Sequence, residues 1–381
     1  MAKDIIKLGD VATYINGYAF KPEDRGEEGL QIIRIQDLTG NSYDLGFYNG
    51  KYPKKIEIND GDVLISWSAS LGVYVWNGGK ALLNQHIFKV KFDKVDIDKS
   101  YFVYAVRYKL NDMGKKTHGA TMKHIVKRDF DATEIPYPPL KKQIEIAINL
   151  DKVLMVIKER KRELKLLDEL IKARFVEMFG TLDTPTQAFE KATLKELCNK
   201  ITDGKHGGCK SEVGTERYFV GAREIYDDDV HYELAPEINI EEFEKDYKRC
   251  NVEIGDFLIV NTGATIGKSA IACDKRTEHT LLQKSVALLK VKKDVLNPIF
   301  LKWCYRVNTK MYMVENASAQ PNLLLSKINA TVIYVPDIEL QNQFADFVHQ
   351  VDKSKFDTMT FAPIYAIINL YLHTYFYQGR R

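Results

Sequence analysis

INDGDVLISWSASLG, residues 58–72, decides the fold because it recurs as VEIGDFLIVNTGATIG at residues 252–267. Gly61 and Asp62 of the first copy match Gly255 and Asp256 of the second. In each copy a Gly-Asp pair precedes a run of branched apolar residues, a pattern typical of a β-strand that begins after a turn. The repeat indicates a duplicated structural unit.

A second repeat follows each copy. The copies are EIPYPPLKKQ (134–143) and the region that begins VIYVPDIELQ (332–341). At an offset of 200 residues, Pro136, Leu140 and Gln143 of the first match Pro336, Leu340 and Gln343 of the second. A helix-like segment comes after both. The chain is therefore predicted to contain two similar domains, each followed by the same kind of helix.

Length and composition set the class of protein. A chain of 381 residues suits two domains with connectors, and 45% hydrophobic with 28% charged residues is ordinary for a soluble globular protein. The net charge of +3 permits nucleic-acid binding without requiring it. Five cysteines without a CxxC pair, and no export signal, predict a cytoplasmic protein with reduced thiols. Pro363 interrupts the apolar tail, so no membrane span is expected.

The first unit, residues 1–140, reads as short strands with one helix. Residues 30–35, 62–67 and 86–92 are rich in branched and aromatic residues, and Tyr101–Leu110 has a helical composition. Residues 189–340 repeat this order. The predicted fold class is α/β, of the α+β kind, with two similar recognition domains.

A long amphipathic helix is predicted between the units, at residues 141–180, with a linker at 181–188. Its apolar residues follow a heptad spacing and form a seam that needs a partner helix: Leu150, Ile157, Leu164, Leu167, Ile171 and Met178. At 1.5 Å per residue the helix would extend roughly 58 Å, the span of about 17 base pairs of DNA. An ordinary core helix is the alternative.

The expected partner is a distal spacer helix at 341–381. Its first part places apolar residues on one face, namely Phe344, Phe347, Val348 and Val351. After about Lys355 the heptads are lost, and Pro363 would break a helix. The distal helix is therefore expected to be truncated or differently structured beyond Lys355.

Several motifs resemble one known family, the specificity subunits of type I restriction-modification systems. They are KLGDVATYINGYAF (7–20), IRIQDL (33–38), GDVLIS (61–66), GATMKHI (119–125), IPYPPLKKQ (135–143) and LIKARFVEMFG (170–180). Their order extends over almost the whole chain. The resemblance implies two target recognition domains, each reading half of a bipartite DNA sequence, joined by antiparallel coiled-coil-like spacer helices.

The resemblance also implies partners and cofactors. Double-stranded DNA and two modification subunits would bind this chain, with restriction/translocase subunits joining through the complex. S-adenosylmethionine, ATP and Mg would act on those partner subunits, so no cofactor, no metal and no catalytic residue is expected here.

DNA contacts in the first unit are expected mainly from a basic segment, residues 107–128, which has Asp112 as its one acidic residue. Such a loop could neutralise phosphates and reach base edges. The candidate residues are Lys115, Lys116, His118, Lys123 and His124. The alternative is a solvated basic face without contacts.

The second unit is less basic at the matching position. Its candidates are Asn261, Thr262, Lys268, Lys284 and Gln320, because Asn and Gln can pair with adenine and cations with phosphate. Arg34 and Arg223 follow the first predicted strand of each unit at comparable points. Either arginine reads DNA or pairs with a nearby carboxylate.

Enzyme motifs are incomplete. GATIGKS (263–269) has one residue too few for a phosphate-binding loop, NPIF (297–300) lacks the second proline of a methyltransferase NPPY loop, and PDIEL (336–340) lacks a nuclease lysine. Two alternatives to a specificity subunit stay open: a self-contained DNA methyltransferase or nuclease with an unrecognised site, and an interaction scaffold that does not bind DNA.

Overall fold

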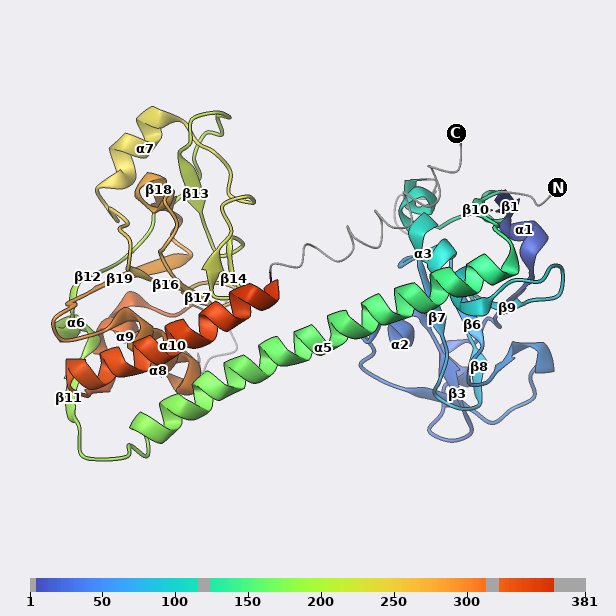
Figure 1. The fold of residues 1–381 in the computed structure, drawn as a ribbon, viewed down its shortest axis with the longest axis horizontal. Helices are drawn as coiled ribbons and strands as arrows, with labels where there is room; N and C mark the ends of the chain where they lie inside the picture. The colour runs from blue at the N-terminus through green and yellow to red at the C-terminus, as the bar shows by residue number, and fades with distance from the viewer. Residues whose placement is uncertain (1–4, 116–123, 313–321, 360–381) are drawn as a thin grey trace. The chain divides into compact units, whose positions relative to one another are not determined.

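The computed structural model describes residues 5–115, 124–312 and 322–359. The contacts within the chain divide it inside one long helix, between Glu159 and Arg160. The part before this boundary is called unit 1, and the part after it unit 2. Figure 1 shows both as mixtures of helices and short strands.

Unit 1 contains two sheets and a helical layer. One sheet has the order β2 (Thr13–Asn16), β9 (Ile87–Lys91), β6 (Val63–Ser66) and β7 (Gly72–Val75). The other has the order β4 (Gly46–Tyr48), β3 (Leu30–Ile33), β8 (Ala81–Leu83) and β5 (Glu57–Ile58). A short pair joins β1 (Ile5–Lys7) to β10 (Glu134–Pro136). The helices are α1 (Leu8–Val11), α2 (Ile35–Thr39), α3 (Lys99–Lys115) and α4 (Lys127–Asp131).

Unit 2 repeats this plan. Its larger sheet has the order β12 (Cys198–Asp203), β19 (Val286–Val291), β16 (Phe257–Val260) and β17 (Ser269–Ile271). The smaller pairs are β11 (Glu190–Thr193) with β20 (Val332–Val335), β13 (Tyr218–Val220) with β18 (Thr280–Leu282), and β14 (Ile225–Tyr226) with β15 (Asp229–Val230). Its helices include α6 (Leu194–Leu197), α7 (Ile240–Tyr247), α8 (Pro298–Val307) and α9 (Leu325–Ala330).

Strand β16 explains why the strand after each Gly-Asp pair is wholly apolar. Successive side chains point to opposite faces of a sheet. Phe257 and Ile259 enter the core that contains α8, whereas Leu258 and Val260 enter a second core under β13 and β18. In unit 1, β6 divides its side chains between two cores in the same way. The predicted duplication of an α/β fold is confirmed by the sheet orders and cores.

The Gly-Asp pair itself closes the turn before the strand. Asn59 N donates to Asp62 Oδ2 at 2.8 Å, and in unit 2 Glu253 N donates to Asp256 Oδ2 at 2.7 Å. Gly61 has φ +85°, in the left-handed region that favours glycine. Burial raises the pKa of Asp256, and Lys290 Nζ lies 2.7 Å from its carboxylate.

The second repeat has a different register from the one expected. Gln143 Oε1 accepts a hydrogen bond from Asp98 N at 3.0 Å, and Gln341 Oε1 accepts one from Asn297 N at 2.9 Å. Both glutamines are buried, whereas Gln343 is exposed. The match of Gln143 with Gln343 at an offset of 200 is therefore wrong: the contacts pair it with Gln341, at an offset of 198.

The buried glutamines tie each spacer helix to its domain. Gln143 Nε2 donates to Pro138 O at 2.8 Å, just before the helix. Gln341 Nε2 likewise donates to Pro336 O at 2.7 Å and to Val295 O at 2.9 Å. In each unit one amide side chain thus joins the segment before the spacer helix to the segment before a second helix, α3 in unit 1 and α8 in unit 2. A side chain without this amide would leave these main-chain groups without their partner.

The predicted central helix is α5 (Leu140–Phe179). Its first part packs into unit 1 through Ile146, Ala147 and Leu150, and Tyr104 donates a hydrogen bond to Asp151. Gly180 follows the last turn with φ +75°, and a side chain there would meet the carbonyl of Thr184. Glycine is required there because the chain turns sharply into the linker.

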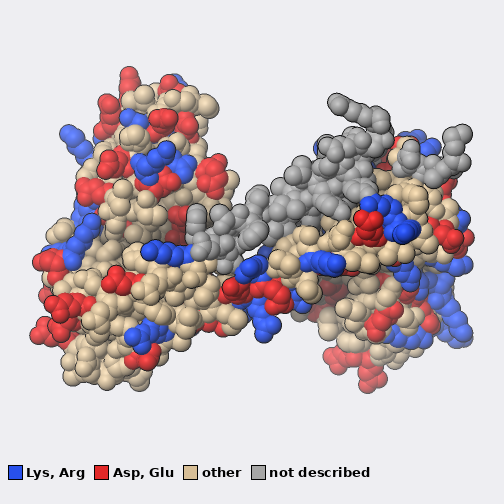
Figure 2. All heavy atoms as spheres, viewed as in Figure 1, with Lys and Arg blue, Asp and Glu red and all other residues tan. Residues whose placement is uncertain are grey.

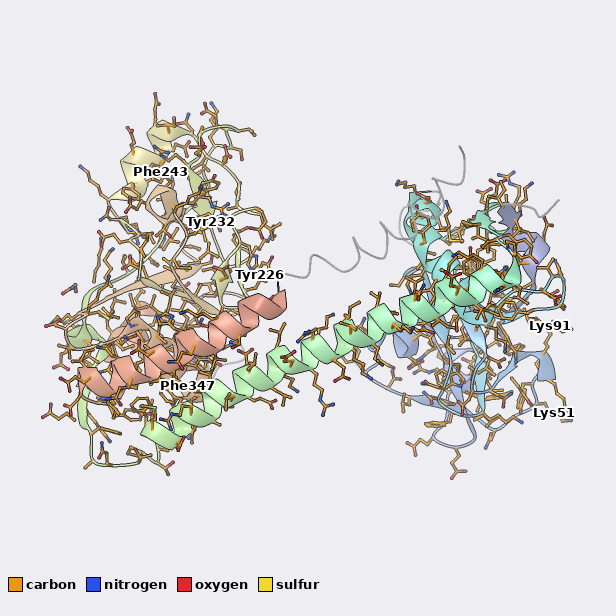
Figure 3. The ribbon with its side chains drawn as sticks, viewed as in Figure 1. Lys51, Lys91, Tyr226, Tyr232, Phe243 and Phe347 are labelled. Carbon is orange, nitrogen blue, oxygen red and sulfur yellow. The ribbon has the colours of Figure 1, made fainter. Side chains whose placement is uncertain are left out.

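In unit 2, α5 lies beside α10 (Ile338–Met359), and the two run antiparallel (Figure 1). The ring of Phe344 lies 5.3 Å from that of Phe175, and Lys355 Nζ lies 2.7 Å from Asp168 Oδ1. Arg174 stacks over Phe347, which Figure 3 labels on α10. The predicted antiparallel partner helix is confirmed as far as Met359. The expectation of a change after about Lys355 meets a helix that continues through Met359, and the rest of the tail lies outside the described residues.

The predicted seam residues differ in burial. Leu150, Ile171, Phe344, Val348 and Val351 are buried, and Ile157, Leu164, Leu167, Met178 and Phe347 are partly buried. Among the described residues, no helix has the length and apolar character needed to cross a membrane.

Candidate nucleic-acid interface

One end of the larger sheet in unit 2 gathers most of the predicted DNA contacts of that unit. Asn261 follows β16 directly, and its main-chain N donates to Ser285 O at 3.0 Å. Leu323 N donates to Asn261 O at 2.7 Å, which brings Asn322 to the same place. Thr262 Oγ1 then donates to Asn322 Oδ1 at 3.2 Å. Asn322 is exposed, so this polar cluster reaches solvent.

Two exposed cations flank this cluster. Ala222 N donates to Ser285 Oγ at 3.2 Å, which places Arg223, the residue after Ala222, near Lys284, the residue before Ser285. Both cations are exposed. Lys268 is also exposed and lies on the β16–β17 turn, where its main-chain oxygen accepts from Val260 N at 2.8 Å. The structure thus brings the described unit 2 candidates to one edge, and Gln320 lies outside the described residues.

The matching end of unit 1 carries aromatic side chains. Trp67 N donates to His86 O at 3.1 Å, and Ile125 N donates to Trp67 O at 3.0 Å, as in unit 2. The ring of Trp67 lies 4.9 Å from that of His86 and 6.5 Å from that of His124. The predicted contact His124 therefore lies at the equivalent edge. Lys116, His118 and Lys123 lie outside the described residues.

His86 has two unusual features at this edge. Its φ is +72°, in the left-handed region where a residue other than glycine costs on the order of 1–3 kcal/mol. Its buried Nδ1 has no hydrogen-bond partner within the described part of the chain. Burial, and secondarily the charge of His124, lowers the pKa of His86 below 6.5. The imidazole is therefore mostly neutral at pH 7.

Arg34 and Arg223 do not occupy comparable positions. Arg34 is buried, its Nε lies 3.1 Å from Asp37 Oδ2, and it also donates to Asp44 O. These hydrogen bonds, of which that to Asp37 is the strongest influence, raise the pKa of Arg34. Of the two roles considered for Arg34, pairing with a carboxylate is the one seen. Lys115 is exposed at the end of α3, 3.6 Å from Asp112.

Main-chain contacts show which residue matches Arg223. Arg34 N donates to Asp37 Oδ2 at 2.7 Å, and Gly221 N donates to Glu224 Oε2 at 2.8 Å. Gly221 is therefore the counterpart of Arg34, and the counterpart of Arg223 is the exposed Gln36. Sequence reasoning missed Gln36 because it aligned the two arginines.

Other residues at these edges were also missed. They are Trp67, Gln85 and His86 in unit 1, and Ser285 and Asn322 in unit 2. For the pair of Gln36 with Arg223 a signal exists in the sequence: Gly17 and Gly204 directly follow the equivalent strands β2 and β12, and at both a side chain would overlap a carbonyl oxygen. Aligning the copies on these glycines recovers the matches at Gln36.

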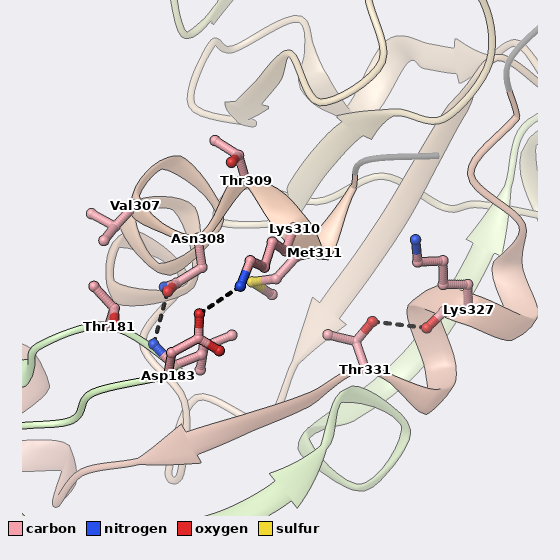
Figure 4. Close-up of a pocket in the computed structure, with 10 residues that line it drawn as sticks. Thr181, Asp183, Val307, Asn308, Thr309, Lys310, Met311, Lys327 and Thr331 are labelled. Atoms are coloured by element: carbon pink, nitrogen blue, oxygen red, sulfur yellow. Dashed lines mark hydrogen bonds and ion pairs between the residues drawn. The ribbon is translucent and has the colours of Figure 1, made fainter. Parts of the chain in front are cut away.

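The face of each unit that Figure 2 shows has mixed charge, with Lys and Arg interspersed with Asp and Glu. A pocket of about 340 Å³ lies between the linker and α8 (Figure 4). It is crossed by an ion pair, Lys310 Nζ to Asp183 at 2.8 Å, and by a hydrogen bond from Leu182 N to Asn308 Oδ1. These contacts fasten the linker to unit 2.

No group of three or more His, Cys, Asp or Glu side chains within residues 5–115, 124–312 and 322–359 is arranged to hold a metal ion. The near-miss phosphate loop 263–269 forms the turn between β16 and β17. NPIF begins α8, where Asn297 Oδ1 accepts a hydrogen bond from Ile299 N at 2.8 Å and so caps the helix. Both motifs thus have structural roles in unit 2.

The chain is similar to known proteins over nearly its whole length. The specificity subunit of the type I restriction enzyme EcoBI from Escherichia coli is 25% identical over 380 residues, covering 91% of this chain and 78% of that protein. The corresponding EcoKI subunit of E. coli strain K12 is 20% identical, covering 91% and 81%.

Solved structures share the fold. A type I restriction-modification S subunit from M. genitalium has a TM-score of 0.53 at 14% identity, covering 97% of this chain and 94% of that chain. A chain from a structure of type I system assembly has a TM-score of 0.56 at 15% identity, covering 98% and 97%. Residues 3–166 and 187–364 each match the type I restriction modification DNA specificity domain. With both units matched, the chain belongs to the family of type I restriction-modification specificity subunits.

Proposed function

We propose that this chain selects the DNA sequence on which a type I restriction-modification complex acts, each recognition domain reading one half of a bipartite site. The recognition domains are residues 1–140 and 189–340, the central spacer is 141–180, the linker is 181–188, and the distal spacer is 341–381. One observation carries the proposal: the two units share main-chain contacts, but they present different side chains at the same edge. Such a pair suits two different half-sites.

The proposed complex supplies the chemistry on other subunits. Two modification subunits would transfer methyl groups from S-adenosylmethionine, and restriction/translocase subunits would use ATP and Mg. The chain itself would bind double-stranded DNA without a catalytic step. Its described residues offer framework roles for the near-miss enzyme motifs, which supports this division.

Mapping methylated positions tests the function. In a host that carries this chain with its modification subunit, we expect two short half-sites separated by a fixed gap of unspecified bases. Methylation without sequence preference would contradict the proposal. The purified chain with DNA and labelled methyl donor should transfer no methyl groups, and transfer by the chain alone would favour the self-contained methyltransferase.

The outer face of α5 supports the docking of modification subunits. In the unit 1 part of α5, Ile144, Ile148 and Met155 are exposed, and Met155 retains 63% of its surface. At 100° per residue these three side chains fall within about 40° of one another, on the side away from the core residue Leu150. Asp151 lies on the same face between Ile148 and Met155 and interrupts the apolar stripe. Exposed apolar side chains gathered on one face in this way suit a protein interaction site.

Replacing Met155 with glutamate should weaken binding of the modification subunit by about 10-fold or more, because a charge would be buried without a partner. Size-exclusion chromatography and titration of the two subunits measure this. Lys161→Glu is the control, since it places glutamate on the same helix about 120° away from the stripe and changes the net charge by two units where Met155→Glu changes it by one. Equal weakening by both variants would point to general charge repulsion instead.

A further inference from the structure

The two units provide an alignment within one chain, fixed by main-chain hydrogen bonds. Tyr18 N donates to Leu83 O at 2.8 Å, and Lys205 N donates to Leu282 O at 2.7 Å. Gln85 N then donates to Tyr18 O at 2.8 Å, and Lys284 N donates to Lys205 O at 3.0 Å. Gln85 and Lys284 therefore occupy the same position in the two units.

Gln36 and Arg223 form a second matched pair, from the contacts of Arg34 and Gly221 described above. Asn84 N donates to Ile33 O at 3.0 Å, and Gln283 N donates to Val220 O at 2.8 Å. In both units this bond joins the segment that carries the first residue of the pair to the segment that carries the second. The four residues that matter are thus two pairs: Gln36 with Gln85, and Arg223 with Lys284.

Each pair lies at the end of two parallel strands. β3 pairs with β8 in parallel, and β13 pairs with β18 in parallel. Gln36 and Gln85 come shortly after the carboxyl ends of β3 and β8, and Arg223 and Lys284 come at the same points after β13 and β18. Because parallel strands end at one edge, both side chains of a pair emerge on the same edge, where ligands of such sheets commonly bind.

Burial separates framework from variable positions. The last residues of the four parallel strands are similar in the two units. Ile33 matches Val220, and Leu83 matches Leu282, and all four are buried. Gln36, Arg223 and Lys284 are exposed, and Gln85 is partly so. The exposed positions differ in charge and in hydrogen-bonding pattern, whereas the buried ones keep their chemistry. Packing therefore does not account for the difference.

The geometry points to a direct reading role: we propose that Arg223 and Lys284 recognise guanine in the half-site of unit 2, and that Gln36 and Gln85 recognise adenine in the half-site of unit 1. Arg and Lys donate to guanine O6 and N7, and Gln pairs with adenine N6 and N7. This rests on the proposed function, because it requires that each unit reads a half-site.

Phosphate binding alone would predict a different pattern. Every duplex carries the same phosphates, so an edge that served only to neutralise them would keep cations in both units. In unit 1 both positions hold neutral amides, which contribute little to phosphate binding but can make paired hydrogen bonds to a base edge. Exchange of both cations for both amides is the change expected when the base that is read changes.

The test exchanges the pair. A chain with Arg223→Gln and Lys284→Gln is assembled with its modification subunit, and methylated positions are mapped on a random DNA library at several salt concentrations. The half-site of unit 2 should change from guanine to adenine at one or two positions, with preference shifting by about 10-fold or more. The half-site of unit 1 should stay the same. Gln36→Arg with Gln85→Lys should do the reverse in the other half-site.

Lys293→Gln is the control, because it removes a lysine charge at the opposite end of β19 from Lys284 and should leave both half-sites unchanged. Unchanged bases in the exchanged chain overturn the inference. If binding then weakens uniformly and the salt slope falls by about two, the two cations contact phosphates only. A wild-type complex without a bipartite site would instead overturn the proposed function, so the two failures are distinguishable.

Discussion

Replacing Phe175 with alanine is expected to lower the free energy of unfolding of unit 2 by about 3–5 kcal/mol. Phe175 is fully buried, and its ring lies 5.0 Å from that of Phe179, 5.5 Å from that of Phe300 and 5.3 Å from that of Phe344. The substitution removes apolar contacts and leaves a cavity where α5, α8 and α10 meet. Urea unfolding followed by hydrogen exchange in β19 measures the loss in this unit.

Val176→Ala is the matched control for Phe175. Val176 is the next residue of α5 and keeps 38% of its surface exposed, so its truncation should cost less than about 1 kcal/mol. Similar losses at both positions would contradict the packing described for the seam. The same Phe175 variant should also loosen α10, because Phe344 would lose its neighbour.

Gln341→Ala is expected to cost about 1–3 kcal/mol, since it leaves the buried carbonyl of Pro336, together with the partly buried N–H of Asn297 and carbonyl of Val295, without their partner. Asn297 caps α8, so the damage should spread to the start of that helix. Thermal and urea unfolding measure the cost. The exposed Gln343→Ala should change stability by no more than about 0.5 kcal/mol.

These two glutamine variants decide between the registers of the repeat. A large effect at Gln343 and a small one at Gln341 would restore the offset of 200 residues and contradict the hydrogen bonds seen. At unit 1, Gln143→Ala should resemble Gln341→Ala, because its amide makes the corresponding contacts.

The parts of the fold that were predictable carry strong local patterns. The strand after each Gly-Asp pair is apolar on both faces, and α5 keeps its heptads from Leu150 to Met178, so both were identified from periodicity. The antiparallel partner was predicted because the apolar face of 344–351 matches that of α5. Such features depend on residues close together in the sequence.

The edge of each unit was harder to predict, since non-local pairing creates it. Insertions between the strands change the offset between copies, so a single offset could not align Gln36 with Arg223. The burial of Arg34 depends on Asp44, which belongs to a loop beyond the helix that Arg34 precedes. Asn261 and Thr262 were identified by residue type, but their contact with Asn322 arises only when α9 returns to the sheet.

Main-chain hydrogen bonds, such as Trp67 N to His86 O and Asn261 N to Ser285 O, hold both edges in place whatever side chains they carry. Substitutions at Gln36, Gln85 and Lys284 should therefore leave stability almost unchanged. Under the proposed reading role, such substitutions would change the half-site that is selected while the protein stays folded. In this fold the positions proposed to read the DNA are therefore separate from those that stabilise the folded protein.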